Sequence, residues 1–477
     1  MTNSPHVSVR RIVSAAVSCA AVLLTACSLS GVLDVPPPIG VSTAADLTNK
    51  GGAEQVYNSA KAQFLRTVYG GGGTIMLGGM LTDELMHADH MGTGGFGGSF
   101  VNIDARVTEP AYGGGESGDG ILSALLSSRS TLLIVAERLR QYETSNLKWR
   151  AGEAFALAGY AELTMAETYC AGVTLSRALP AGGYEYGMPL STDSLFGAAA
   201  AHFDSALANA YGDSTVLQLA HVGLARARLG RGDFAGAASA AAGVRLDFVY
   251  QMISQPAEPL AAPLATNFFA FPFGCPWINV ADRKGTNGLN FVSARDPRIA
   301  FDSTSQTCDG ARFHYPLKFG TPSTVVALAT GVEARLIAAE AALHAGQPGA
   351  WADTLNALRN NAASTYVQLA GPMAPLTADS TSAASDRRRI DVLFRERAFW
   401  LYGTGTRLGD LRRLLRLYKT YGYTSDTLYP VGPYPPTPNN EVATYGTDVS
   451  FTLPTRVGGE VVTNPNYRGC TVPTTQE

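Results

Sequence analysis

The sequence predicts a mainly α-helical fold built from helical hairpins that stack on one another. Segment 220–237 has a small residue within a helix, a Gly-Asp turn followed by an aromatic residue, and an alanine where two helices would cross. Segment 332–358 shows a related pattern, and Ser194–Ala210 carries apolar residues along one helical face. Together these observations favour a tetratricopeptide-like scaffold, in which each hairpin buries its apolar face against the next.

The first residues have the pattern of an export signal. Two arginines precede an apolar run, Ile12–Leu24, whose roughly 13 residues are fewer than the roughly 20 that a membrane-spanning helix needs. The run ends in Leu24-Thr25-Ala26-Cys27, which looks like a bacterial lipobox. We therefore expect residues 1–26 to be a lipoprotein signal peptide and Cys27 to carry the lipid, because several acyl chains on one residue anchor a protein stably. The alternative is an ordinary secretory signal with a coincidental cysteine.

After the signal we expect a short tether and a long folded body. Residues 27–45 form the tether, in which Pro36-Pro37-Pro38 favours an extended polyproline segment. Residues 46–477 are long enough for two or three packed subregions. The helices expected in the first part of this body are Asp46–Val68, a short one around Leu81–His90, Ile121–Glu143 and Leu147–Thr168.

Residues 244–325 lack a helical period and predict an irregular, loop-rich insert. Loops of this length are usually functional or disordered, and the aromatic residues here argue against disorder. Aromatic faces pack well on sugars, so four residues of the insert are candidate ligand-binding residues: Phe271, Phe273, Trp277 and Tyr315. Two alternatives stay open. The rings could simply pack the loop onto the helices, and a second candidate cluster lies in the tail at Tyr421, Tyr423, Tyr429 and Tyr434.

Two more helices and a long tail complete the predicted architecture. The helices are expected at Arg387–Tyr402 and Arg407–Tyr418, with glycines between them. Arg407 and Asp410 lie one helical turn apart and Glu396 lies on the preceding helix, which indicates a structural ion network rather than chemistry. Residues 420–477 are rich in Tyr, Pro and Gly, and we expect them to wrap over the helical body.

Charge and cysteine content limit the function classes. The net charge is −3 and the isoelectric point is about 6.2, so nothing indicates a nucleic-acid partner. An exported chain can form disulfides, and the four cysteines downstream of Cys27 allow three pairings. The shortest loop favours Cys275–Cys308, which leaves Cys170 to pair with Cys470. No pair has the C-x-x-C spacing typical of zinc sites.

The sequence offers no persuasive catalytic or metal motif. Asp83, His87 and His90 would share one face of a helix, but their spacing matches no familiar metal site, and solvated or capping residues are the expected interpretation. The glycine runs lack the Gly-Lys-Ser/Thr ending of a phosphate loop, and neither Gly-x-Ser-x-Gly nor His-Glu-x-x-His occurs. We predict a protein that is not an enzyme and that needs no cofactor or metal.

These motifs, in this order, resemble the SusD/RagB family of outer-membrane nutrient-binding lipoproteins. The strongest mark is Arg395–Trp400 followed by Arg407–Arg413. Other marks are the lipobox, Leu33-Asp34-Val35, Ser191–Phe196, Gly232-Asp233-Phe234, Asp296-Pro297-Arg298, Arg335–Ala341, Leu355–Arg359, Phe451–Pro454 and Asn464-Pro465-Asn466. Leu408 stands where the family usually has tryptophan, and Thr455-Arg456-Val457 stands in place of a Gln or Glu pair. We therefore interpret the chain as a divergent member.

The resemblance implies a SusD-like fold and a role in nutrient uptake. Family members are lipid-anchored at the outer membrane, facing the cell surface, above a TonB-dependent transporter of the SusC type. They capture a glycan or a peptide and deliver it to that transporter. The alternative is a lipid-anchored, tetratricopeptide-like scaffold for the assembly of envelope proteins, and a surface hydrolase is a third, less favoured interpretation.

Overall fold

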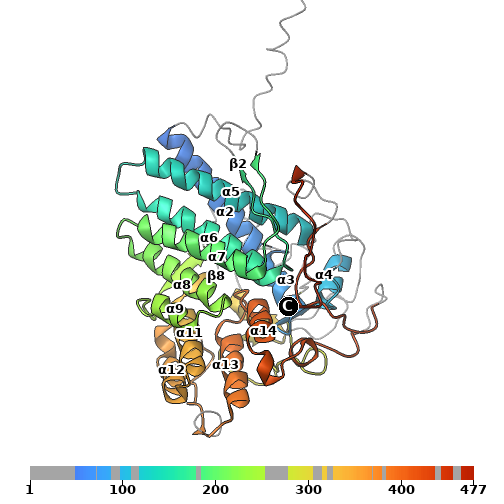
Figure 1. Cartoon of the computed structure of the whole chain (residues 1–477). Helices are drawn as coiled ribbons and strands as arrows, with labels where there is room; N and C mark the ends of the chain where they lie inside the picture. The colour runs from blue at the N-terminus through green and yellow to red at the C-terminus, as the bar shows by residue number, and fades with distance from the viewer. Residues whose placement is uncertain are drawn as a thin grey trace, which may run out of the picture.

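The computed structural model describes most of the chain in twelve stretches. These are residues 49–70, 72–87, 97–108, 118–178, 184–252, 278–304, 314–319, 326–367, 369–378, 383–435, 442–454 and 463–477. The described residues are mainly helical, as the sequence predicts, and most of the helices follow one another down one side of the molecule (Figure 1).

The first described helices are α2 (Lys50–Tyr69), α3 (Thr74–Leu81), α4 (Gly97–Asp104), α5 (Gly118–Tyr142) and α6 (Trp149–Thr168). The long helices α2, α5 and α6 form the upper part of the stack, and the short helices α3 and α4 lie to one side of it (Figure 1). The side chain of Asn49 accepts a hydrogen bond from the Gly52 N–H and caps α2, so the helix begins later than the sequence predicts. α5 packs against both α2 and α6, and the side chains of α6 are almost all buried.

The predicted helix around Leu81–His90 is wrong. The helix α3 ends at Leu81, and β1 (Leu85–His87) begins after a turn. β1 pairs antiparallel with β5 (Ile278–Val280), so its backbone groups are satisfied by a distant segment instead of by a helical turn. His87 therefore lies on a strand, and His90 lies outside the described residues.

The next helices form the predicted hairpin scaffold. They are α7 (Thr192–Ala208), α8 (Ser214–Gly230), α9 (Phe234–Ala241), α11 (Gly331–His344) and α12 (Pro348–Asn360). A Cβ atom added to Gly223 would lie 2.2 Å from the Phe203 ring, and one added to Gly230 would lie 2.6 Å from the Phe196 ring. Two glycines of α8 thus face two phenylalanines of α7 at the same seven-residue spacing. This arrangement lets the two helices approach closely.

Sequence signals at the turns fix where these helices begin. Asp213 accepts hydrogen bonds from the N–H groups of Thr215 and Val216 at the start of α8. Asp233 does the same for Gly236 at the start of α9, directly after Gly232, whose φ of +80° suits glycine. The Gly-Asp turn noted in the sequence therefore ends α8 and caps the start of α9.

The C-terminal helices pack below and beside this stack. They are α13 (Asp386–Trp400), α14 (Arg407–Leu417) and the short α15 (Ser425–Leu428), with 3-10 turns η3 (Leu317–Phe319), η4 (Ala362–Ser364) and η6 (Lys419–Tyr421). Gly403 and Gly405 both have positive φ angles, so the chain can turn sharply between α13 and α14.

The described strands are short and occur in antiparallel pairs. Besides β1–β5 these pairs are β2 (Arg177–Ala178) with β3 (Tyr184–Glu185), β4 (Val249–Met252) with β8 (Val326–Thr330), and β6 (Phe301–Asp302) with β7 (Tyr315–Pro316). Four of these strands and η3 lie within the predicted irregular insert, whose described residues contain no α-helix.

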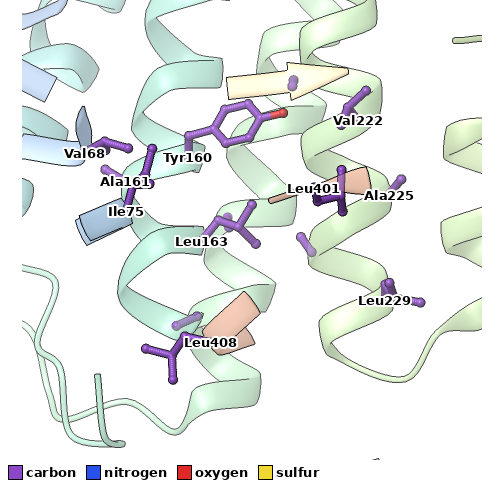
Figure 2. Packing of buried hydrophobic residues seen from close by; sticks show 14 of the residues in the cluster. Val68, Ile75, Tyr160, Ala161, Leu163, Val222, Ala225, Leu229, Leu401 and Leu408 are labelled. Carbon is purple, nitrogen blue, oxygen red and sulfur yellow. The ribbon is translucent and has the colours of Figure 1, made fainter. Parts of the chain in front are cut away.

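One large apolar core joins the N-terminal, hairpin and C-terminal helices. Figure 2 shows Tyr160 and Leu163 of α6 facing Val222 and Ala225 of α8. The buried Tyr160 hydroxyl donates to the Leu219 carbonyl oxygen at 3.1 Å, so its polar atom has a partner. Figure 2 also shows Leu408 in this core. The position where the family usually has tryptophan therefore keeps an apolar packing role.

The tail returns to the end of α6. The Phe451 N–H donates to the Thr168 carbonyl oxygen at 2.7 Å, and the Phe451 carbonyl oxygen accepts from the Cys170 N–H at 3.0 Å. The Val449 N–H donates to the Thr474 carbonyl oxygen, which ties two parts of the tail together. The described part of the tail thus lies against the helical body.

One stretch among the described helices, Gly120–Tyr142 in α5, is long and apolar enough to cross a membrane by length and composition. Its packing against α2 and α6 accounts for that composition, because a core helix passes the same test.

Candidate ligand-binding surface

The aromatic cluster predicted in the insert is described only in part. Phe271, Phe273 and Trp277 lie outside the described residues. Tyr315 lies on β7, half-buried and paired with Asp302 of β6. Burial raises the pKa of its phenol above the usual value. Tyr315 also packs against the core, and the role of this cluster in ligand binding stays a prediction.

The tail tyrosines are mostly buried. Tyr423, Tyr429 and Tyr434 lie in the interior, and their hydroxyl groups donate to the Asp391 carboxylate, the Val449 carbonyl oxygen and the Asp104 carboxylate, respectively. Only Tyr421 exposes a large part of its ring. These tyrosines therefore stabilise the tail rather than present a joint surface.

The structure instead places a cavity of about 430 Å³ along the outer face of α5. One helical stripe forms its floor, with residues at positions 123, 126, 127, 130, 131 and 134. This spacing places side chains on one side of a helix. Four of the six floor residues carry a hydroxyl group, namely Ser123, Ser127, Ser130 and Thr131.

The other wall of the cavity contains two exposed tyrosines. Tyr184 on β3 and Tyr186 just after it leave 59% and 38% of their surfaces exposed. Their rings are nearly parallel, with an interplanar angle of 22° and a centroid distance of 6.2 Å. Ser176, next to β2, and Thr463, in the tail, complete the lining. Figure 1 shows β2 beside α5.

The tail holds this hairpin in place. The buried Asn464 side chain donates to the Gly187 carbonyl oxygen at 3.0 Å and to the Ser176 hydroxyl at 3.3 Å. The Gly187 N–H donates to the same hydroxyl at 3.1 Å. A Cβ atom on Gly187 would lie 2.7 Å from the Leu175 backbone nitrogen, so this close approach requires glycine. The Asn464-Pro465-Asn466 motif thus holds in place the wall of the cavity that contains the two tyrosines.

A second cavity, of about 360 Å³, continues along α5 and shares Ser130 and Ile134 with the first. Its lining includes charged side chains, among them Arg129, Glu137 and Arg177. Arg129 donates to Glu162 at 2.6 Å, and the same carboxylate lies 2.7 Å from the His202 ring nitrogen. The groove therefore has one uncharged half, next to the tyrosines, and one half lined by charged side chains.

Sequence reasoning missed this groove, although two signals were present. The first is the recurrence of Ser and Thr on the outer face of a helix that is otherwise apolar, and the second is the Tyr-Glu-Tyr sequence at 184–186. Neither signal shows from the sequence that the two segments meet.

Several charged side chains of α13 and α14 are buried and paired, which supports the expected structural network. Asp410 accepts from Arg397 at 2.8 Å and from Arg413 at 2.9 Å, and Arg413 also donates to Glu340. Arg407, however, donates to Asp83 rather than to Asp410, at 2.8 and 2.9 Å. Glu396 belongs to a separate group and accepts from Arg298 and Arg359.

The expectation that Asp83 is a solvated or capping residue is wrong, and its neighbour Glu84 also lies in the interior. Both carboxylates are buried. Burial tends to raise the pKa of Asp83, but the charge and hydrogen bonds of Arg407 outweigh it, so the pKa lies below its usual value. Burial dominates for Glu84 and raises its pKa to about 7, although the Gly403 N–H donates to it at 2.7 Å.

The described residues hold no cluster suited to a metal ion, counting groups of three or more His, Cys, Asp or Glu side chains. The sulfur atoms of Cys170 and Cys470 form a disulfide with a Cα–Cα distance of 5.6 Å. This bond joins the end of α6 to the tail. Cys275, Cys308 and the predicted lipid-carrying Cys27 lie outside the described residues.

Comparison with known proteins identifies the fold. The SusD family model matches residues 333–448. A SusD superfamily protein from Bacteroides fragilis has a TM-score of 0.62 at 14% identity, over 88% of this chain and 99% of its own. A SusD-like carbohydrate-binding protein from Bacteroides vulgatus ATCC 8482 has a TM-score of 0.55 at 14% identity, over 77% and 84%. A laminarin-binding SusD-like protein has a TM-score of 0.54 at 11% identity, over 89% and 99%.

The search of curated proteins found no significant match. The fold is that of SusD-like helical proteins over nearly the whole length of these structures. The resemblance stated from the sequence is confirmed: residues 333–448 match the SusD family model, and the chain has the fold of SusD-like structures.

Proposed function

We propose that this protein captures a glycan at the bacterial outer membrane and delivers it to a TonB-dependent transporter of the SusC type. The observation that carries the proposal is the SusD family match over residues 333–448 on a SusD-like fold. Two of the similar structures are described as carbohydrate-binding and laminarin-binding. Their descriptions favour a glycan over a peptide as the cargo.

The partner is tested by isolation from native membranes. The tagged full-length protein is solubilised in mild detergent, captured and analysed by mass spectrometry. A large outer-membrane barrel with a plug domain should accompany it in near-equal amount. Recovery of barrel-assembly components in place of such a transporter would favour the envelope-scaffold alternative and overturn the proposal.

The anchor is tested at the predicted lipidation site. Cys27→Ala should move the protein from the membrane fraction to the soluble fraction, because the acyl chains supply the membrane affinity. Metabolic labelling with a palmitate analogue should mark the wild type and not the variant. Persistent membrane attachment of the variant would show that the lipid is not at Cys27.

The protein binds its cargo without cleaving it. Incubation of the purified protein with each glycan that it binds should release no new reducing ends. Steady release above the level of a boiled sample would assign a hydrolytic activity and contradict this part of the proposal.

A further inference from the structure

We propose that the uncharged half of the groove along α5 is a binding site for a short neutral oligosaccharide, with Tyr184 and Tyr186 as its stacking surface. This inference rests on the proposed function, since it assigns a place and a chemical class to the captured glycan. The site comprises Ser176, Tyr184 and Tyr186, the hydroxyl-bearing face of α5 and Thr463 of the tail.

The two tyrosines have the exposure that a sugar platform requires. Tyrosines usually bury most of their ring, and an exposed aromatic pair lining a cavity marks a contact surface. The rings are nearly parallel and face a cavity instead of the core. The C–H-rich face of a pyranose packs on such rings, while the phenol hydroxyls reach the sugar hydroxyls at the edge.

The opposite wall matches the polar edges of a sugar. Hydroxyl groups both donate and accept hydrogen bonds, as sugar hydroxyls do. Within the described residues, the hydroxyls of Ser123, Ser127, Ser130 and Thr131 make no hydrogen bond to another side chain or to the backbone. They are therefore available to a ligand. A helix face meant only for water would be expected to carry charged residues more often than serine and threonine.

Charge and backbone chemistry select the ligand class. No residue that lines this half of the groove is charged, so an anionic or cationic ligand gains no ion pair there. A peptide is usually held through backbone hydrogen bonds at an open strand edge or through charged groups at its ends. The floor here is a helix, whose backbone groups are used within the helix. A neutral carbohydrate is the class that fits.

Size and rigidity support the same conclusion. A volume of about 430 Å³ lies within the range of roughly 300–1,000 Å³ for small-molecule sites. Asn464 and Ser176 hold the hairpin against the body through hydrogen bonds. A wall that is fixed before binding loses little conformational entropy when the ligand arrives.

The test uses the mature protein and a defined set of probes. Laminarihexaose, maltohexaose, xylohexaose and mannohexaose are titrated by isothermal calorimetry. The wild type should bind at least one of them. A double variant with Tyr184→Ala and Tyr186→Ala should raise the Kd of that probe at least tenfold. Ser127→Trp, which fills the cavity from an exposed position of the floor, should do the same without removing an aromatic ring.

A matched control separates this site from general effects. Tyr211 is 57% exposed, close to the value for Tyr184, and lies beside Lys148 at the start of α6, outside the lining of the groove. Tyr211→Ala should leave the Kd within twofold of the wild type. All variants should keep the wild-type melting temperature within about 2 °C, because surface truncations away from special features cost little.

Two results would overturn the inference. If the double variant and Ser127→Trp bind a probe as tightly as the wild type, the sugar site is elsewhere. If the wild type binds none of the neutral probes, the carbohydrate class assigned to the groove is wrong. Co-purification of the transporter is measured on the same variants. The loss of sugar binding with an intact transporter complex separates a failure of the site from a failure of the proposed function.

Discussion

The buried ion pair between Asp83 and Arg407 gives the sharpest test of how this fold is held together. The two residues are 324 positions apart, and they join the turn after α3 to the first residue of α14. Their side chains are 1% and 6% exposed. Replacing Asp83 with Asn keeps the shape of the side chain and removes the charge that balances Arg407.

The expected loss is large because the arginine stays buried. Asp83 accepts two hydrogen bonds from Arg407, at 2.8 and 2.9 Å, and one from the Leu289 N–H at 2.9 Å. Hydrogen bonds to charged groups contribute about 1.5–3 kcal/mol each. Breaking one partner of a buried ion pair costs about 3–5 kcal/mol. We therefore expect Asp83→Asn to lower the free energy of unfolding by about 3–5 kcal/mol at pH 7.

Equilibrium unfolding in urea, followed by circular dichroism, measures this loss. A double variant with Asp83→Asn and Arg407→Met removes both charges, so its loss should be smaller than the sum of the two single losses by about 2 kcal/mol or more. The pKa of Asp83 is lowered in the folded state, so its contribution is present above the unfolded pKa of about 3.9. It disappears as the pH falls through the lower folded pKa, and the difference between variant and wild type should shrink there.

An exposed ion pair supplies the control. Arg177 donates to Glu185 at 2.7 and 3.0 Å, a geometry similar to that of the buried pair, but the two side chains are 68% and 63% exposed. Glu185→Gln should cost about 1 kcal/mol or less, because water screens the charges. A loss below about 1 kcal/mol for Asp83→Asn, or additive losses in the double variant, would refute the importance assigned to the buried pair.

Three further predictions concern other parts of the fold. As the pH rises from 5 to 8, the stability of Glu84→Gln relative to the wild type should increase by about 2–3 kcal/mol. The reason is that the folded pKa of about 7 makes ionisation of the buried carboxyl increasingly costly as the pH rises above the unfolded pKa. A pH-independent difference in urea unfolding would contradict this. Gly223→Ala should lower the free energy of unfolding by about 1–2 kcal/mol, because its Cβ atom would overlap a buried ring. Gly349→Ala, whose Cβ atom would have nothing within 4 Å, should be neutral or stabilising. Equal effects of the two substitutions in thermal unfolding would argue against the close helix contact. Cys170→Ser with Cys470→Ser should lower stability by about 2–5 kcal/mol, since the bond closes a loop across 300 positions; identical unfolding of the wild type with and without reductant would show that the bond does not form.

The helical scaffold was predictable from the sequence because its signals are local. Apolar periodicity, the Gly-Asp turn and the glycines of α8 mark helices and their crossings within a few residues of where they act. The misassigned segment at Leu81–His90 shows the limit of this reasoning. Its residues allow a helix, but a strand formed instead because β5, almost 200 positions away, offered a pairing partner.

The candidate site depends on contacts that no local pattern specifies. The stripe on α5 and the tyrosines of the hairpin are visible in the sequence as isolated features, and only the tertiary structure brings them to one cavity. The aromatic residues of the insert were predicted as ligand-binding residues from the local composition alone. Composition does not distinguish a ring that packs inward, as Tyr315 does, from one that faces a cavity, as Tyr184 does.

The sequence by itself determined the approximate positions of most helices, the Gly-Asp turn and the resemblance to the SusD/RagB family. The tertiary structure decided which carboxylate meets which arginine, as Asp83 with Arg407 in place of Asp410, and where a groove forms. The physical reason is how far apart along the chain the interacting residues lie. Helix formation and capping depend on neighbours within one or two turns, whereas buried ion pairs and cavities depend on how segments hundreds of residues apart pack against a shared core.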